Sequence, residues 1–456
     1  MYFVAAPGSA LLPETRCELV VELKAHVERI QYNDRGEDMD AGQIAEFIRQ
    51  AKTASLEVAN ASGEQKHQVL TGLAQGLRRE AARILEANAR DIAKAEENSL
   101  DAARIDRLRL TEAGIEAMAQ ACGHVADMDD PVGSIESMQK RPNGLLVGQM
   151  RIPLGLVAMI YESRPNVTID AGILCLKAGN GVVLRGGSEA FFSNQALASV
   201  FQEALQAAGL PPAAISLLPT TDRAAVQTLL QMGDVVDVVI PRGGEGLIKA
   251  VTEQATMPVL KHFKGVCHIY VDDTAELDAA LDIVENAKVQ RPGVCNALEC
   301  LLVHKDVAER FLPAVAQRLG AAGVKFRACA ASLPLLGEQA QAANDQDWGR
   351  EFLDLILAVK VVEDQDAAQA HIRQYGSNHS EAILATDHNR AMRFLREVDA
   401  SAVLVNASTR FNDGGELGLG AEIGISTSKL HAYGPMGVHE LTSRKFVLLG
   451  QGQVRS

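Results

Sequence analysis

From Pro153 onward, short apolar runs alternate with amphipathic stretches, and this alternation restricts the folds that the chain can adopt. A short apolar run bounded by turn residues is typical of a strand buried on both faces, and an amphipathic stretch is typical of a helix that covers it. Strands joined through helices run parallel and need helices on both faces of their sheet. The pattern therefore predicts an α/β fold with doubly wound parallel sheets.

Two sets of such units succeed each other along the chain. The first predicts strands at residues 155–161, 181–185, 215–218, 235–240 and 266–271, with helices at 168–178, 191–208, 223–231 and 246–254. The second places strands and helices in turn at residues 297–304, 307–319, 353–362, 367–375, 382–385, 389–398 and 402–406. Ala-rich helices precede both sets, over residues 42–128. We predict a cofactor-binding domain over 39–267, a catalytic domain over 268–430 and a C-terminal return over 431–456.

A cysteine stands just before the first strand of the second set. Cys295 comes after a Pro-Gly turn in V-Q-R-P-G-V-C-N, where Pro292 and Gly293 let the backbone turn sharply. A thiol presented at the end of a strand suits a nucleophile. A buried structural thiol is the alternative, because free cysteine is among the most buried residue types.

Two glycine-rich stretches are candidates for loops that contact ligands. Arg242, Gly243 and Gly244 lie between an expected strand and an expected helix, and free amides at the start of a helix suit a cofactor phosphate. The spacing lacks the third glycine of a dinucleotide motif, so an ordinary strand-to-helix turn fits equally well. Residues 412–424 (N-D-G-G-E-L-G-L-G-A-E-I-G) form the one long loop that we expect to line a site.

Charge and cysteine content exclude several classes of protein. Lys and Arg number 44 and Asp and Glu number 58, and this net charge of −14 argues against a nucleic-acid or anionic membrane partner. No apolar run is long enough to span a bilayer. The seven cysteines are odd in number and scattered, which favours a cytoplasmic location over a disulfide framework. We expect no metal site, because no Cys/His set accompanies Cys295 and Cys300.

Two segments outside the core pattern suggest self-association. Residues 144–152 and 444–449 each predict an exposed strand, and we expect them to build part of a homo-oligomer interface. An ordinary intramolecular hairpin is the alternative. Residues 1–38 differ in pattern from the rest of the chain, and Met39 opens a natural start, so we interpret 1–38 as a non-native extension from a misplaced start codon.

Four stretches together resemble the aldehyde dehydrogenase superfamily, and within it the gamma-glutamyl phosphate reductases. They are residues 153–167 (P-L-G-L-V-A-M-I-Y-E-S-R-P-N-V), 176–189 (L-K-A-G-N-G-V-V-L-R-G-G-S-E), 290–299 (Q-R-P-G-V-C-N-A-L-E) and 362–383, which contains Y-G-S-N-H-S-E-A-I. The last stretch is the most specific, because general aldehyde dehydrogenases lack it. The resemblance extends from about Met39 to the end of the chain.

The resemblance implies an activity and a set of roles. Cys295 would attack L-glutamate 5-phosphate, and Asn166 would stabilise the oxyanion. The cofactor, NADP(H), would contact Arg185, Ser188, Glu189, Arg242, Gly243 and Gly244. The substrate would contact residues from three segments: Arg164, Arg291, Ser377, Asn378, His379 and Ser380. The product, L-glutamate 5-semialdehyde, would cyclise spontaneously to 1-pyrroline-5-carboxylate in proline biosynthesis, and a separate glutamate kinase would supply the acyl phosphate.

One departure from the superfamily pattern is informative. Hydrolytic aldehyde dehydrogenases carry a glutamate that activates water, whereas residues 260–265 (L-K-H-F-K-G) hold no carboxylate in the corresponding segment. An acyl-phosphate reductase needs no such water, since water would consume its thioester. Two alternatives remain: an acylating or hydrolytic aldehyde dehydrogenase that uses NAD, and a non-catalytic binding protein that keeps the fold.

Overall fold

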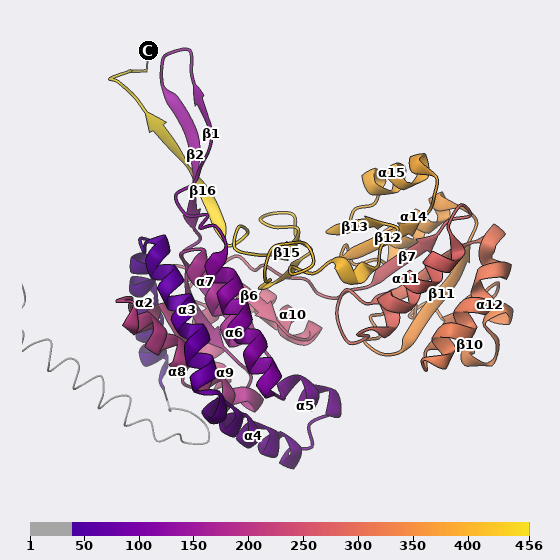
Figure 1. Cartoon of the computed structure of the whole chain (residues 1–456), viewed down its shortest axis with the longest axis horizontal. Coiled ribbons are helices and arrows are strands. Elements are labelled where there is room, and N and C mark those ends of the chain that lie inside the picture. The colour runs from indigo at the N-terminus through magenta and orange to yellow at the C-terminus, as the bar shows by residue number, and fades with distance from the viewer. Residues whose placement is uncertain (1–38, 456) are drawn as a thin grey trace, which may run out of the picture.

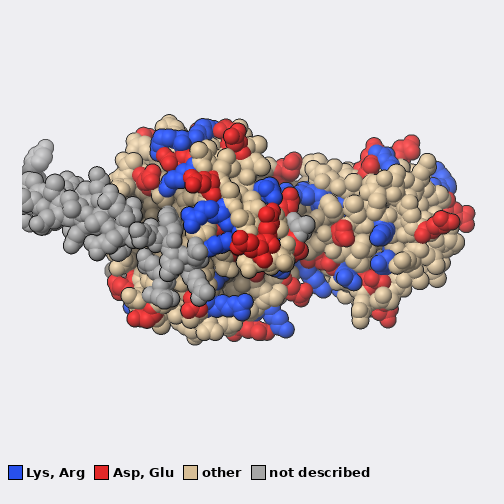
Figure 2. All heavy atoms as spheres, turned by 90° about the horizontal axis from the view of Figure 1, so that it is seen from below, with Lys and Arg blue, Asp and Glu red and all other residues tan. Residues whose placement is uncertain are grey.

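The computed structural model describes residues 39–455, without the side chains of Ala102 and Ala103. The predicted extension over residues 1–38 lies outside the described residues. The chain forms two α/β parts and a narrow β-arm (Figure 1). Lys and Arg are interspersed with Asp and Glu on the face seen in Figure 2. Within residues 39–455, no helix is long and apolar enough to cross a membrane.

The first part begins with helices, as the Ala-rich sequence predicts. They are α2 (Ala41–Val58), α3 (Gly63–Arg79), α4 (Ala81–Glu97), α5 (Ala102–Leu108) and α6 (Glu112–Asp127). Capping boxes at Asp40 and Ser62 start α2 and α3. Asp91 of α4 accepts hydrogen bonds from the backbone amides of Phe192 and Ser193. These bonds join α4 to the start of α8 (Phe191–Ala207). These helices pack against the first α/β part and share its hydrophobic core.

The first sheet is parallel, with the strand order β5-β4-β3-β6. Its strands are β3 (Leu156–Tyr161), β4 (Gly181–Arg185), β5 (Ile215–Leu217) and β6 (Val238–Arg242). Its helices are α7 (Val167–Lys177), α8 (Phe191–Ala207), α9 (Arg223–Leu230) and α10 (Glu245–Gln254). The chain moves from β3 to β4 and β5, then returns to the other side of β3. This reversal places a topological switch point between the carboxyl ends of β3 and β6, where ligands bind in such sheets.

The second sheet is also parallel, with the order β10-β9-β11-β8-β7-β12-β13. Its strands are β7 (Cys267–Val271), β8 (Leu298–His304), β9 (Lys325–Ala328), β10 (Ala340–Ala342), β11 (Ile356–Val362), β12 (Ser380–Leu384) and β13 (Ala402–Val405). Its helices are α11 (Leu277–Val289), α12 (Lys305–Ala321), α13 (Leu333–Leu336), α14 (Gln365–Tyr375) and α15 (His388–Glu397). The expectation that strand 266–271 belongs to the first set is wrong, because β7 pairs with β8 and β12.

The arm is a three-stranded antiparallel sheet with the order β1-β2-β16. The strands are β1 (Ile135–Lys140), β2 (Leu146–Pro153) and β16 (Thr442–Leu449). Both predicted exposed strands are present and pair with each other, with Arg151 opposite Arg444. Strand β1 was not predicted from the sequence. A short pair, β14 (Gly424–Ser426) and β15 (Gly434–Met436), lies between the two α/β parts in Figure 1.

Candidate active site

Contacts link the carboxyl edge of the first sheet to the amino edge of the second. Arg242, at the end of β6, forms an ion pair with Glu422 of the long loop, with 3.5 Å between Nη2 and Oε1. Glu422 in turn accepts a hydrogen bond of 2.9 Å from the amide of Gly414. The loop over residues 412–424 therefore carries a contact between the two parts.

Cys295 lies half-buried at the amino end of β8. Its carbonyl oxygen accepts a hydrogen bond from the thiol of Cys267, 3.1 Å away. A Cβ on Gly265 would collide with the backbone of Cys295, so only glycine allows this close approach. Donor atoms of His262, Cys295 and His379 all lie within 4.8 Å of one another. The predicted nucleophile thus stands beside two imidazole rings and a second thiol.

His379 is fully buried beside Cys295. Burial lowers the pKa of its imidazole to about 4, so the ring is neutral near pH 7. Its Nδ1 lies 2.8 Å from the hydroxyl of Ser380, which also accepts from the amide of Asn412 at 2.8 Å. Its Nε2 has no partner among the described residues. Ser377 lies near this cluster, because its hydroxyl accepts from the amide of Val266 at 2.8 Å.

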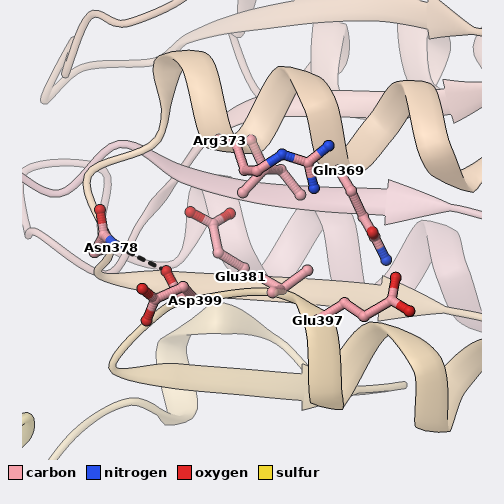
Figure 3. Close-up of a pocket in the computed structure, with 8 residues that line it drawn as sticks. Gln369, Arg373, Asn378, Glu381, Glu397 and Asp399 are labelled. Atoms are coloured by element: carbon pink, nitrogen blue, oxygen red, sulfur yellow. Dashed lines mark hydrogen bonds between the residues drawn. The ribbon is translucent and has the colours of Figure 1, made fainter.

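Asn378 does not join this cluster, although its neighbours in sequence do. It is exposed and has φ +59°, and its amide donates to the carbonyl of Asp399 at 2.9 Å. It lines a separate pocket of about 200 Å³ among α14, β12 and α15, with Glu381 and Arg373 (Figure 3). The other lining residues of this pocket include neither Cys295 nor His379.

Two arginines, Arg164 and Arg410, lie close enough to Cys295 for its charge to act on their pKa values. Burial and, to a lesser extent, nearby arginines lower the pKa of Arg164 to about 10, whereas the charge of Cys295 opposes this shift. Burial also lowers the pKa of Arg410, and Asp413 and Cys295 oppose it. Arg410 is held by hydrogen bonds to Asn296 and, at 2.8 Å, to Gln290. These cations, with the exposed Arg291, suit an anionic substrate group.

Asn166 occupies the N-cap position of α7, just after the carboxyl end of β3, and its side chain makes no capping hydrogen bond there. Its side-chain amide donates to Asp170 one helical turn later, with 2.8 Å between Nδ2 and Oδ2. Burial raises the pKa of Asp170 to about 6. An amide nitrogen carries two hydrogens, so the bond to Asp170 leaves one hydrogen for a further acceptor.

The predicted cofactor residues lie at the carboxyl ends of β4 and β6. Arg185 donates from Nη2 to the carbonyl of Thr221 at 3.0 Å, while its buried Nε has no partner among residues 39–455. Ser188 is exposed, but Glu189 is occupied by both the amide and the hydroxyl of Ser163. At β6, Gly243 and Gly244 are exposed, and the amide of Gly244 donates to Glu162 at 3.1 Å.

Several neighbours of Cys295 were not predicted: His262, Cys267 and Arg410. The signal for His262 was present, because it lies in the segment where the expected carboxylate is missing. Cys267 lies on β7 and Arg410 in a short 3-10 helix, and their contacts depend on the fold of the whole second part.

A second group of potential ligands lies inside the second part. His268, Cys300 and His371 are fully or almost fully buried and lie within 4.8 Å of one another. The ammonium of Lys360 lies 3.2 Å from Nδ1 of His371. An ammonium can only donate, so the ring proton of His371 must sit on Nε2, which then cannot bind a metal. The cluster fits a hydrogen-bonded core better than a metal centre.

Comparison with known proteins gives a consistent family assignment. The sequence model of the aldehyde dehydrogenase family matches residues 31–328. Gamma-glutamyl phosphate reductase of Nitratidesulfovibrio vulgaris is 62% identical over 415 residues, which cover 91% of this chain and 99% of the relative. The same enzyme of Desulfovibrio desulfuricans is 62% identical over 419 residues, which cover 91% of this chain and 99% of that relative.

Solved structures agree with this result. The crystal structure of gamma-glutamyl phosphate reductase from Thermotoga maritima matches with a TM-score of 0.88 and 43% identity, and the match covers 91% of this chain and 100% of that one. An acetylating aldehyde dehydrogenase from Geobacillus thermoglucosidasius has the same fold, at a TM-score of 0.64 and 19% identity, over 91% of this chain and 98% of its own. The chain therefore belongs to the aldehyde dehydrogenase family, and within it to the gamma-glutamyl phosphate reductases.

Proposed function

We propose that the chain reduces L-glutamate 5-phosphate to L-glutamate 5-semialdehyde and phosphate, with NADPH as reductant and a Cys295 thioester as intermediate. The half-exposed Cys295 thiol at the amino end of β8, with Arg164 and Arg410 near enough to interact with its charge, carries this proposal. A thiolate is the reactive form of cysteine, and nearby cations stabilise it. Arg164, Arg291 and Arg410 supply those cations and balance the charge of the acyl phosphate.

The residues around Cys295 support each part of the acyl transfer. The thiolate attacks the acyl carbon, and the bond to phosphate breaks with its electron pair on phosphate. The free amide hydrogen of Asn166 and the backbone amide of Cys295 are the proposed oxyanion donors; losing one such donor raises a barrier by about 3 kcal/mol. Ser377, His379 and Ser380 belong to the cluster beside Cys295, and we propose that they bind the substrate. Asn378 faces its separate pocket and is not among the proposed substrate contacts.

NADPH, when bound, supplies the hydride that reduces the thioester. The carboxyl end of β4 fits its 2′-phosphate, because the buried Nε of Arg185 lacks a partner within the described chain. The exposed Arg223, at the start of α9, lies close enough to lower the pKa of Arg185, after the larger effect of burial. Ser188 and Glu189 would border the ribose, and Gly243, Gly244 and Arg242 the pyrophosphate. Because these residues lie at the carboxyl ends of β4 and β6, we propose that residues 39–267 form the cofactor domain. Residues 268–430, which carry Cys295, would form the catalytic domain.

We expect Arg223→Gln to lower kcat/KM for NADPH about tenfold, since a charge-assisted hydrogen bond is worth about 1.5–3 kcal/mol. The kcat/KM for NADH should change little, because NADH lacks the 2′-phosphate. Steady-state kinetics with both cofactors test this. Arg373→Gln, at an exposed arginine of α14, is the matched control. An equal loss with both cofactors would contradict the assignment of Arg223 to the 2′-phosphate.

The reverse reaction tests the proposed function. The full chain receives 1-pyrroline-5-carboxylate, which equilibrates with the semialdehyde, together with NADP and inorganic phosphate, and NADPH absorbance is followed. Phosphate-dependent NADPH formation supports the acyl-phosphate route. Oxidation that proceeds without phosphate would mean that water accepts the acyl group, and would favour a hydrolytic aldehyde dehydrogenase.

The substrate and the cysteines bear on the cellular setting. An acyl phosphate hydrolyses readily, so we propose that a separate glutamate kinase supplies it. The described cysteines are all free thiols, which supports a reducing cytoplasm. The chemistry corresponds to the second step of proline biosynthesis from glutamate.

The β-arm supports a homo-oligomer. β16 lies at the edge of its sheet and exposes Phe446 and Leu448, which are 68% and 57% accessible. An edge strand with exposed apolar side chains is a template for pairing with another chain. We propose that two copies pair through the arm.

Phe446→Glu is expected to convert the oligomer to monomers, because each copy would bury a charge at the interface. Lys445→Glu, on the opposite face of the same strand, should leave the assembly intact. Light scattering coupled to size-exclusion chromatography measures the mass of each variant. A monomeric wild-type chain at micromolar concentration would overturn the proposed interface.

A further inference from the structure

We propose that His262 is a catalytic residue: its Nε2 takes the proton of the Cys295 thiol and passes it to the departing phosphate. This inference rests on the proposed acyl-phosphate chemistry and adds a proton carrier to it. Three observations support it: the position of the ring, its hydrogen bond to β14, and the burial or pairing of the other basic groups near Cys295.

The position of His262 brings an imidazole to the thiol. A ring nitrogen of His262 lies within 4.8 Å of Cys295 Sγ, and the ring packs edge-on against His379 with 5.6 Å between centroids. His262 is half-buried, so its proton can exchange with solvent, whereas His379 is sealed from it. A general base must come within hydrogen-bond reach of its proton, and such distances often shorten when substrate binds.

The hydrogen bond to β14 determines which nitrogen is basic. Nδ1 of His262 lies 3.0 Å from the carbonyl oxygen of Ile425. A carbonyl oxygen only accepts, so Nδ1 carries the proton and the lone pair is on Nε2. A second hydrogen bond, of 3.2 Å, runs from the amide of Thr427 to the carbonyl of Lys261. It attaches the segment that holds His262 to the residue just after β14. The strand therefore orients the ring and selects the tautomer that can accept a proton, as second partners of catalytic histidines do.

The other basic groups near Cys295 are buried or paired. Nε2 of His379 has no partner among the described residues, but the ring is fully buried, its Nδ1 lies against Ser380, and burial lowers its pKa to about 4. Glu351 accepts from the amide of Gly265 at 2.8 Å. Glu422 pairs with Arg242 and accepts from Gly414, and Glu381 pairs with His268. Arg164, Arg291 and Arg410 are cations and cannot act as bases at neutral pH. Among the described residues of this group, His262 combines closeness to the thiol with partial exposure to solvent.

The proton balance is complete. The S–H bond of Cys295 breaks and an N–H bond forms at Nε2, which gives a thiolate and an imidazolium. The thiolate forms the C–S bond, the C–O bond to phosphate breaks, and the imidazolium donates its proton to phosphate. Hydride addition to the thioester then releases the aldehyde and the thiolate directly. The sum is acyl phosphate, NADPH and one proton giving aldehyde, NADP and hydrogen phosphate.

The first test measures thiol reactivity without substrate, so it does not depend on the proposed substrate. Cys295 is alkylated with iodoacetamide at pH 7 and the labelled peptide is quantified by mass spectrometry. We expect His262→Gln to slow alkylation about tenfold or more, whereas His388→Gln, at an exposed surface histidine, should match the wild type. Added imidazole should restore the rate in His262→Ala but not change it in the wild type.

The second test measures turnover. General acid–base groups contribute on the order of 10²–10⁴-fold, so His262→Gln should lower kcat by at least about 10²-fold. Unchanged alkylation in both His262 variants, whether or not turnover falls, would overturn the role in proton transfer. If the wild type lacked phosphate-dependent activity but alkylation still depended on His262, the proposed substrate would fail and the thiol–imidazole pair would stand.

Discussion

Replacing Cys295 with serine is expected to abolish reduction of the acyl phosphate, with a loss on the order of 10⁴-fold or more. A serine hydroxyl stays protonated at neutral pH and forms an ester that is a poorer hydride acceptor than a thioester. The guanidinium groups of Arg164 and Arg410 would still surround the site, so substrate binding should persist. Activity in both directions, together with substrate binding by calorimetry, measures the two effects separately.

The control for this variant is a second half-buried thiol. Cys329 lies in the same part of the chain, at the end of β9, and hydrogen-bonds Ser332 at 3.2 Å. Cys329→Ser should keep activity within about twofold, because surface and loop substitutions away from a site have small effects. A fully active Cys295→Ser would remove the thioester from the mechanism and revive a non-catalytic role for this cysteine.

Replacing Lys288 with methionine is expected to destabilise the second part by about 3–5 kcal/mol. Lys288 of α11 and Glu299 of β8 are both fully buried, with 2.8 Å between Nζ and Oε2. Burial raises the pKa of Glu299 to about 7 and lowers the pKa of Lys288, so desolvation outweighs their attraction for both groups. Without Lys288, the carboxylate keeps one hydrogen bond among residues 39–455, from the amide of Leu353 at 3.1 Å.

The effect of Lys288→Met should depend on pH. A carboxyl group whose folded-state pKa exceeds its unfolded value of 4.5 favours the folded state at low pH and loses this contribution as pH rises through about 7. The destabilisation should therefore be larger at pH 8 than at pH 5. Chemical denaturation at both pH values measures it. The double variant Lys288→Met/Glu299→Leu should recover most of the stability, because it leaves no unpaired charge; failure to recover would contradict this account.

Local patterns in the sequence determined most of the secondary structure. Strand 181–185 and the helices at 168–178 and 223–231 were predicted to within one residue, because apolar periodicity and turn residues act over a few positions. The Pro-Gly turn before Cys295 similarly indicated a thiol at the end of a strand. Motifs of this kind also carried the family assignment, since they are contiguous in the chain.

Tertiary structure alone decided which elements and side chains meet. The apolar run of β7 is compatible with either sheet, and only its pairing with β8 and β12 assigns it to the second. The backbone of Asn378, at φ +59°, turns its side chain away from the cluster that holds His379. His262 reaches Cys295 because Ile425, far along the chain, orients its ring. Long-range pairing and side-chain direction depend on the packing of distant segments, and a local pattern contains neither.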